Sequence, residues 1–267
     1  MSAVRLLVVT AVAAERDAAA RGLRPAAASP PPAPPGRDAI RVTRGGDGPG
    51  HRPVRADLVA GGVGPAASAA STATAPTAAA ARGEPYDLVV SAGIAGGFAP
   101  VAAPGSVVVA DRVIAADLGA DSPDGFLPAD ALGFGTTEHT CAPRLAAAVA
   151  RGLGAVHAPV LTVSTATGTA GRAALLRERH DAAAEAMEGF GAAEATAGHG
   201  TPFLEIRTVS NAVGPRDRSA WRVPEALAAL EDAFAAPHAV LTRCVPPPHG
   251  RPPEVRGSSG AVPSPRG

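Results

Sequence analysis

The feature that most constrains the fold of this chain is the alternation of short, continuously apolar runs with alanine-rich segments. Residues 4–12 and 86–97 form two of these runs, and residues 202–214 form another that ends in a polar loop. Such runs are typical of strands buried on both faces, and their alternation with helical segments is typical of a three-layer architecture. We therefore predict an α/β fold with a central mixed sheet flanked by helices.

The remaining segments extend this pattern. Shorter apolar runs predict strands at 39–43, 54–64, 105–117 and 159–164, and composition predicts helices starting near Ala13 and at 65–82, 142–152, 171–180 and 223–235. Proline-rich residues 25–36 are expected to form a surface excursion without regular structure, and residues 121–138 a long loop. We predict a single domain over residues 1–244 and a disordered tail, rich in Pro, Gly and Ser, over 245–267.

The amino-acid composition excludes several classes of function. All 24 basic side chains are arginine, and the absence of lysine excludes Schiff-base chemistry, a pyridoxal anchor and a P-loop. A net charge of +0 predicts no general attraction to nucleic acid or to an anionic membrane. The first apolar run is too short to span a membrane, because it ends at Glu15, Arg16 and Asp17. Two cysteines are too few to form a disulfide framework. We expect a cytoplasmic enzyme or binding protein.

The glycine-rich stretch SAGIAGG, residues 91–97, follows a predicted strand. Its spacing departs from G-x-G-x-x-G, which disfavours a dinucleotide or methyl-donor loop. The alternatives are a tight strand-to-helix turn and a backbone cradle for a small ligand at the carboxyl ends of the strands.

Two other sets of residues carry weaker chemical signals. Glu138, His139 and Cys141 include metal-ligand types, but three ligands on one loop favour an ordinary polar loop. Glu188, in EAMEGFG, is followed by small residues that allow close backbone approach. Its two oxygens are suited to accept from adjacent hydroxyls, and the alternative is an exposed glutamate that starts a helix.

Five motifs occur in a fixed order: AVAAERD at 11–17, AGGVG at 60–64, SAGIAGG, AMEGFG at 186–191 and IRTVSN at 206–211. This ordered set resembles the superfamily of purine nucleoside phosphorylases and methylthioadenosine nucleosidases over residues 3–235. Within that superfamily the chain looks most like the futalosine hydrolases, the nucleosidases of the alternative menaquinone pathway. The resemblance implies the three-layer phosphorylase-type fold.

The resemblance also implies roles for individual residues around the sugar. Glu15 matches the glutamate that holds the attacking water, and Glu188 matches the one that binds the 2′ and 3′ hydroxyls of ribose. Met187 matches a residue that packs against the sugar, and Arg207 matches an arginine near the nucleophile and the ribose. These residue types suit N-glycosidic cleavage, because its oxocarbenium-like transition state needs an activated water and anionic partners.

A second group of residues matches positions around the purine base. Ala95 and Gly96 match backbone positions beside the base, whereas Ser210 and Asn211 match the pair that handles the leaving purine. The resemblance implies Asn211 as the third catalytic residue, with Glu15 and Glu188. The phenylalanine that stacks on adenine in the nucleosidases aligns near Gly168, so we expect Phe190 to stack on the base and Thr169 to contact the substrate.

Asn211 also indicates which purine leaves. It is the single asparagine of the chain, and adenine-specific nucleosidases have aspartate at the matching position. The NH2 group of asparagine can donate to a 6-oxo group, and its carbonyl can accept from a protonated N7. This pattern favours hypoxanthine or guanine, and a mispaired buried group costs about 1–3 kcal/mol.

Hydrolysis is favoured over phosphorolysis because an acid, Glu15, stands where phosphorylases have a glycine turn that leads to an arginine. The expected reaction is hydrolysis of futalosine to hypoxanthine and dehypoxanthine futalosine, without metal or cofactor, in a homo-oligomer. Residues 118–140 are expected to hold the 5′ substituent, which in futalosine carries a carboxylated aromatic. The alternatives are a methylthioadenosine or S-adenosylhomocysteine nucleosidase, a purine nucleoside phosphorylase, and a nucleoside-binding or methyl-donor-binding protein without catalysis.

Overall fold

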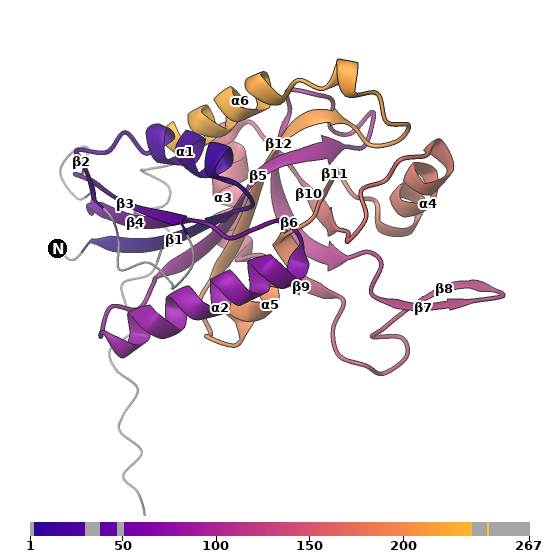
Figure 1. Cartoon of the computed structure of the whole chain (residues 1–267), viewed down its shortest axis with the longest axis horizontal. Helices are drawn as coiled ribbons and strands as arrows, with labels where there is room; N and C mark the ends of the chain where they lie inside the picture. Colours follow the sequence, from indigo (N-terminus) through magenta and orange to yellow (C-terminus); the bar gives the residue numbers. More distant parts are fainter. Residues whose placement is uncertain (1–2, 30–37, 47–50, 237–244, 246–267) are drawn as a thin grey trace, which may run out of the picture.

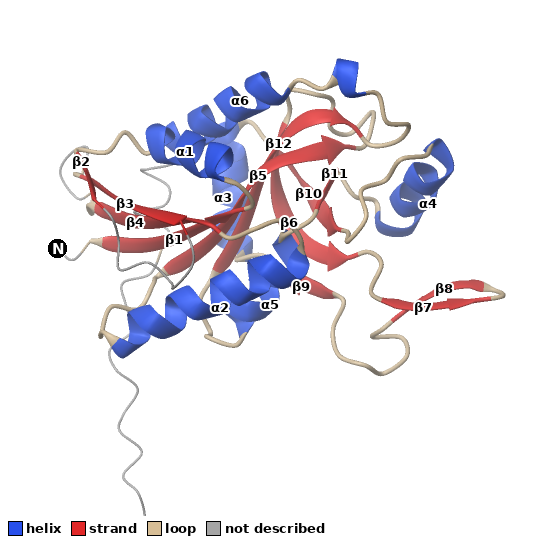
Figure 2. Ribbon diagram, viewed as in Figure 1, coloured by secondary structure: helices blue, strands red, loops and turns tan. Residues whose placement is uncertain are grey.

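The computed structural model describes residues 3–29, 38–46, 51–236 and 245, and strands and helices alternate along most of them (Figures 1 and 2). The strands are β1 (Val4–Thr10), β2 (Ala27–Ser29), β3 (Asp38–Arg44), β4 (Val54–Ala60), β5 (Leu88–Gly97), β6 (Val107–Ala115), β7 (Gly119–Ser122), β8 (Gly125–Pro128), β9 (Glu138–Thr140), β10 (Val156–Thr162), β11 (Ala184–Ala186) and β12 (Phe203–Ala212). The helices are α1 (Ala13–Gly22), α2 (Pro65–Ala81), α3 (Pro143–Leu153), α4 (Ala170–His180), α5 (Gly189–Ala197) and α6 (Val223–Ala235), with a 3-10 turn at Arg218–Ala220.

The central sheet is mixed, as the sequence predicts. Its strands follow the order β11-β10-β6-β12-β5-β1-β4-β3-β2, with β9 paired to β6. Strand β1 lies parallel to β4 and β5, and β5 lies parallel to β12, whereas β6 runs antiparallel to β12. Because β11 pairs with both β10 and β5, the strands β5, β12, β6, β10 and β11 close into a small barrel.

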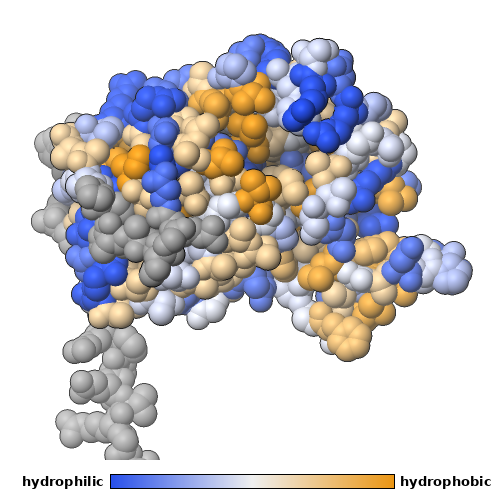
Figure 3. Space-filling view, viewed as in Figure 1, coloured by the Kyte–Doolittle hydropathy of each residue, from blue (hydrophilic) through white to orange (hydrophobic). Residues whose placement is uncertain are grey.

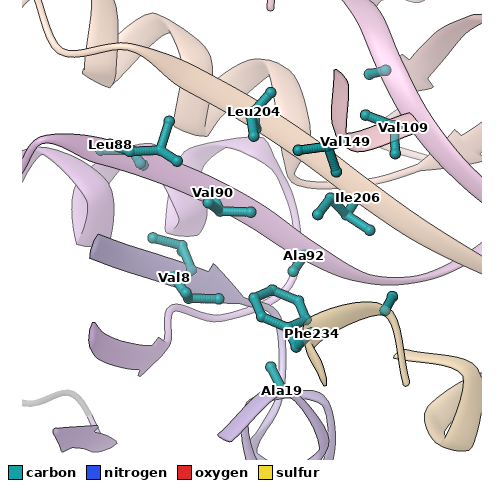
Figure 4. Close-up of a cluster of buried hydrophobic side chains, with 14 of the residues drawn as sticks. Val8, Ala19, Leu88, Val90, Ala92, Val109, Val149, Leu204, Ile206 and Phe234 are labelled. Carbon is teal, nitrogen blue, oxygen red and sulfur yellow. The ribbon is translucent and has the colours of Figure 1, made fainter. Parts of the chain in front are cut away.

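Helices cover both sides of this sheet. Helices α1 and α6 pack against each other on one side, and α2 and α5 pack against each other on the other side (Figure 1). A Cβ atom on Gly191 of α5 would overlap the backbone carbonyl of Pro65 in α2, so glycine allows these two helices to approach closely. In the α/β core, Val90 and Ile206 lie near Phe234 of α6 (Figure 4). Burial on both faces explains why most residues of the central strands β1 and β5 are apolar or small.

Five short strands were not predicted: β2, β7, β8, β9 and β11. Residues 119–122 and 125–128 form the hairpin β7–β8, which projects from the body of the molecule at the right of Figures 1 and 3, so the prediction of an irregular loop over 121–138 is wrong. The prediction that 25–36 lacks regular structure is wrong at β2, which pairs with β3. Each of these strands is too short to show a recognisable alternation of apolar and polar residues. Its extended conformation is determined by pairing with an adjacent strand.

One residue of the predicted tail is packed against the core. Val245, predicted as the first residue of the disordered tail, is 3% exposed and belongs to the core. Residues 246–267 and residues 30–36 of the proline-rich segment lie outside the described residues. Among the helices described, none has the length and apolar character needed to cross a membrane.

Candidate active site

A cavity of about 660 Å³ opens where β1, β5 and β12 end at their carboxyl termini. This edge of an α/β sheet is where such folds bind ligands, because loops rather than strand pairs occupy it. Seven of the predicted site residues line the cavity: Glu15, Ala95, Gly96, Met187, Glu188, Ser210 and Asn211. The structure therefore brings together residues that lie as much as 196 positions apart in the sequence.

Glu15 lies in the first turn of α1 and is 4% exposed. Its Oε2 accepts hydrogen bonds from the backbone amides of Ala11 and Val12, at 3.0 and 3.3 Å, and its Oε1 accepts from the amide of Ile94 at 2.9 Å. Burial raises the pKa of Glu15 above 4.5, although the charge of Arg207 opposes this shift. A carboxylate held in place with a raised pKa suits the role of a general base.

Arg207 lies immediately behind the cavity and is 1% exposed. Its Nη1 is 3.2 Å from Glu188 Oε2, its Nε donates to Glu205 Oε1 at 2.7 Å, and its Nη2 donates to Ser91 Oγ at 3.1 Å. Burial alone would lower the pKa of Arg207, but the charges of Glu205, Glu188 and Glu15 raise it above its ordinary value. Arg207 is thus a permanent cation that holds the carboxylates around it.

Glu188 stands at the N-terminus of α5 and is 6% exposed. Its Oε1 accepts from the amide of Gly64 at 3.2 Å, and its Oε2 accepts from the amide of Met187 at 3.3 Å. Gly64 precedes α2, so Glu188 joins the starts of two helices on the same side of the sheet. The interpretation of Glu188 as an exposed helix-initiating residue is therefore wrong, because the carboxylate is buried and faces the cavity.

Two glycines make room for these carboxylates. A Cβ atom on Gly93 would lie 2.6 Å from Glu15 Oε1 and 2.8 Å from Arg207 Nη1. A Cβ atom on Gly189 would overlap the carboxylate of Glu205. Any side chain larger than hydrogen at these positions would displace the charged groups. The glycine of SAGIAGG at position 93 and that of AMEGFG at position 189 are therefore needed for space.

The opposite wall of the cavity is formed by a β-bulge. Strand β12 shifts register relative to β5 between Val209 and Asn211, which leaves Ser210 as the extra residue. Ser210 Oγ is 2.8 Å from Asn211 Oδ1, and Asn211 Nδ2 donates to the backbone carbonyl of Ala212 at 3.0 Å. These two contacts fix the orientation of the amide, because a flipped amide would place Oδ1 against the carbonyl of Ala212. One hydrogen of Nδ2 stays available to a ligand.

Besides Arg207, which lies behind the cavity, two predicted contact residues do not line it. Thr169 is exposed, and its Oγ1 accepts from the amide of Arg172 at 3.2 Å, so it caps the start of α4. Phe190 lies on α5, where its ring centroid is 5.2 Å from that of His139. The structure gives neither residue the position that the resemblance implies. Both expectations depended on motif position, which does not determine the direction of a side chain.

Several residues that line or support the cavity were not predicted. Thr167 donates to Glu185 from its amide at 2.7 Å and from its hydroxyl, and both residues line the cavity. Glu205 is 0% exposed, burial raises its pKa, and its Oε2 has no hydrogen-bond partner among the described residues. The sequence pattern could have indicated Glu205, because this acidic residue interrupts an apolar strand two positions before Arg207. Trp221, the single tryptophan, also lines the cavity.

The charges around the cavity limit its chemistry. Glu15, Glu188 and Glu205 surround one cation, Arg207, which is already engaged by carboxylates. This arrangement disfavours a second anion such as phosphate and favours positive charge that develops on a bound sugar. Within the part of the chain that the structure describes, no cluster of His, Cys, Asp or Glu has metal-site geometry. His139 instead forms a 2.6 Å contact with Glu194.

Comparison with solved structures supports the fold. The chain superposes with a TM-score of 0.71 on a 5′-methylthioadenosine/S-adenosylhomocysteine nucleosidase from Colwellia psychrerythraea, solved in complex with adenine, at 23% identity over 90% of this chain and 96% of that one. The corresponding nucleosidase from Neisseria meningitidis gives a TM-score of 0.68 at 19% identity, over 86% and 96% of the two chains. The phosphorylase-type fold is thereby confirmed.

Sequence comparison gives the family. The model of the phosphorylase superfamily matches residues 44–246. The futalosine hydrolase of Streptomyces coelicolor is 58% identical over 86% of this chain and 93% of its own length. The futalosine hydrolase of Acidothermus cellulolyticus is 46% identical over 87% of this chain and 90% of its own length. The chain therefore belongs to the phosphorylase superfamily and, within it, to the futalosine hydrolases.

Proposed function

We propose that this protein hydrolyses the N-glycosidic bond of futalosine to give hypoxanthine and dehypoxanthine futalosine, a step in menaquinone biosynthesis. The observation that carries the proposal is the buried carboxylate of Glu15, held by three backbone amides at the wall of the cavity. Relatives at 58% and 46% identity bear the name futalosine hydrolase, which supports the choice of substrate. The resemblance also supports a homo-oligomeric, cytoplasmic enzyme.

In the proposed reaction, Glu15 holds a water molecule and accepts its proton as the water attacks the anomeric carbon. Its raised pKa brings its basicity closer to neutral pH than that of an ordinary glutamate. Because Glu15 keeps three amide contacts, its carboxylate does not need to reorganise as the water attacks.

The sugar is proposed to lie between Met187 and Glu188. Glu188 binds the 2′ and 3′ hydroxyls, whose interaction with a carboxylate strengthens as the ring becomes cationic. Arg207 fixes Glu188 from the side opposite the cavity, at 3.2 Å. The net negative charge of the three carboxylates around this arginine stabilises the oxocarbenium-like transition state relative to the neutral nucleoside.

The base is proposed to lie against Ala95 and Gly96, with Asn211 facing its N7 and 6-oxo positions. The free hydrogen of Asn211 Nδ2 donates to the 6-oxo group, and Oδ1 accepts from N7 after the leaving hypoxanthine takes up a proton there from solvent water. Ser210 supports this orientation through its contact with Oδ1. An adenine base would place an amino donor against the Nδ2 donor, which accounts for selection of a 6-oxopurine.

A substrate comparison tests this function. Purified protein is incubated separately with futalosine, inosine and methylthioadenosine, and the free base is measured by chromatography. The proposal predicts hypoxanthine from futalosine and little or no adenine from methylthioadenosine. Preferential release of adenine would replace it with the nucleosidase activity named for the solved neighbours, and binding of all three without cleavage would replace it with a nucleoside-binding role.

A further inference from the structure

The outer end of the cavity carries a charge opposite to that of its inner end. Arg216, Arg218 and Trp221 follow β12 in the chain, and all three line the cavity. Both arginines are exposed, whereas Trp221 is half-buried. The guanidinium carbons of Arg216 and Arg218 lie 5.6 and 5.8 Å from the centroid of the Trp221 ring. The Trp221 ring thus makes cation–π contacts with two guanidinium groups at the mouth of the cavity.

These two cations have no carboxylate partner in the part of the chain that the structure describes. Within the described residues, neither Arg216 nor Arg218 takes part in an ion pair. Asp217 lies between them in sequence, but its carboxylate accepts from the amide of Ser219 at 2.9 Å and from the hydroxyl of the same residue. The mouth of the cavity therefore has donors to offer an anionic ligand.

Apolar side chains also line the cavity. Val12 and Val63 line the cavity and are 44% and 58% exposed, which is high for valine. With Trp221 they provide surface for an apolar group that extends out of the cavity. A ligand that contacts both the apolar side chains and the two arginines would carry an aromatic or aliphatic segment that ends in an anionic group.

We propose that Arg216 and Arg218, together with Trp221, form a subsite for a carboxylated aromatic substituent on the 5′ carbon of the nucleoside. The assignment rests on the proposed function, which places the base against Asn211 and the sugar beside Glu188 and so directs the 5′ carbon towards the remaining lining. Futalosine carries a group of this chemistry. The arginines bind the carboxylate as charge-assisted donors, and the ring of Trp221 contacts the aromatic group.

This subsite replaces the one expected from the sequence. We predicted that residues 118–140 would hold the 5′ substituent, but no residue of that segment lines the cavity in the described chain. The β7–β8 hairpin projects away from the body of the protein instead (Figure 1). The correct segment, residues 215–221, was not singled out because its arginines resemble ordinary solvated charges.

The test uses futalosine and its methyl ester, in which one added methyl group removes the charge of the carboxylate. Hypoxanthine release is measured for the wild type, for the double variant Arg216→Ala/Arg218→Ala, and for Arg222→Ala. Arg222 is a matched control because it directly follows residues 215–221 in the chain but pairs with Glu225 at 3.4 Å and does not line the cavity. Circular dichroism establishes that each variant is folded.

The wild type and Arg222→Ala are expected to prefer futalosine over its ester by about tenfold or more in kcat/KM, because a hydrogen bond to a charged group contributes at least this factor. The double variant is expected to lose that preference through slower turnover of futalosine. The preference should also decline with added salt in the wild type and not in the double variant. An unchanged preference in the double variant would overturn the subsite.

The experiment also distinguishes three further outcomes. If the wild type releases no hypoxanthine from either compound, the proposed function itself fails. If the two arginines instead bind free phosphate, phosphate will stimulate the wild type, and a sugar 1-phosphate will form; this result would overturn the carboxylate assignment. Turnover of futalosine with equal efficiency to its ester in the wild type would also overturn the assignment and leave the proposed function intact.

Discussion

Glu205 and Arg207, two residues apart on β12, form an ion pair with a 2.7 Å separation between Oε1 and Nε, and both side chains are almost completely buried. Alternation along a strand points both residues to the same face of the sheet. Glu205 occupies one edge of the guanidinium, so Nη1 is directed towards Glu188. The position of the Glu188 carboxylate, which is proposed to bind ribose, thus depends on the charge of Glu205, a residue that does not line the cavity.

The first prediction concerns the stability that Arg207 provides. Arg207→Met should lower the free energy of unfolding by about 3–5 kcal/mol, because it leaves buried carboxylates without their cation. Urea unfolding at neutral pH measures the change. Arg21→Met is the control, since Arg21 pairs with Glu231 at 2.7 Å on the surface, where the loss should stay below about 1 kcal/mol. Equal losses in both variants would contradict the buried-network account.

The second prediction concerns pH. Glu15 must be ionised to accept a proton from water, and burial raises its pKa above 4.5. The acidic limb of kcat/KM for futalosine should therefore have an apparent pKa above that of an ordinary glutamate, measured from about pH 4 to about pH 8. Activity falls as pH decreases through the raised pKa.

The same shift has the opposite effect on folding. Because the folded-state pKa values of Glu15 and Glu205 are raised, protonation favours the folded state. Their contribution to stability is fully present below the unfolded pKa and is lost as pH rises through the raised values. Stability from these two groups and catalytic activity should thus change in opposite directions. An acidic limb at or below pH 4.5 would be inconsistent with the environment of Glu15.

The third prediction concerns the space that Gly93 leaves. Gly93→Ala should reduce kcat for futalosine by about tenfold or more, because its Cβ would displace Glu15 Oε1 and Arg207 Nη1. Gly171→Ala is the matched control: Gly171 lies in α4, and no atom lies within 4 Å of the added Cβ. That variant should keep wild-type kinetics. Wild-type kcat in Gly93→Ala would show that the Glu15–Arg207 geometry does not limit the reaction.

The fourth prediction concerns Asn211. Asn211→Asp replaces Nδ2 with an oxygen, which would face the carbonyl of Ala212 and the 6-oxo group of the base as acceptor against acceptor. We expect kcat/KM for futalosine to fall by about 10- to 100-fold, from a mispairing cost of about 1–3 kcal/mol. The 6-amino analogue of futalosine serves as the comparison substrate and should be affected less. A variant that cleaves futalosine as well as the wild type would remove Asn211 from base recognition.

Most of the fold could be predicted because long, buried strands and alanine-rich helices leave strong patterns. The site could be predicted where a motif fixes both the residue and its backbone setting, as at Glu15, Glu188 and Asn211, all of which line the cavity. Local sequence patterns do not reveal the direction of a side chain. For this reason the sequence could not show that the ring of Phe190 lies beside His139 and not in the cavity. Nor do they reveal charge pairing in space: Arg216 and Arg218 differ from other surface arginines through their position at the cavity mouth.

The most direct test of the account measures the sugar product of futalosine cleavage by the wild type and by Glu15→Gln, each with and without phosphate. We predict that the wild type releases hypoxanthine at the same rate in both buffers and forms dehypoxanthine futalosine with a free anomeric hydroxyl. Glu15→Gln should remain folded and lose nearly all of this activity. A sugar 1-phosphate, a dependence on phosphate, or near-normal turnover by Glu15→Gln would contradict hydrolysis by a water molecule that Glu15 activates.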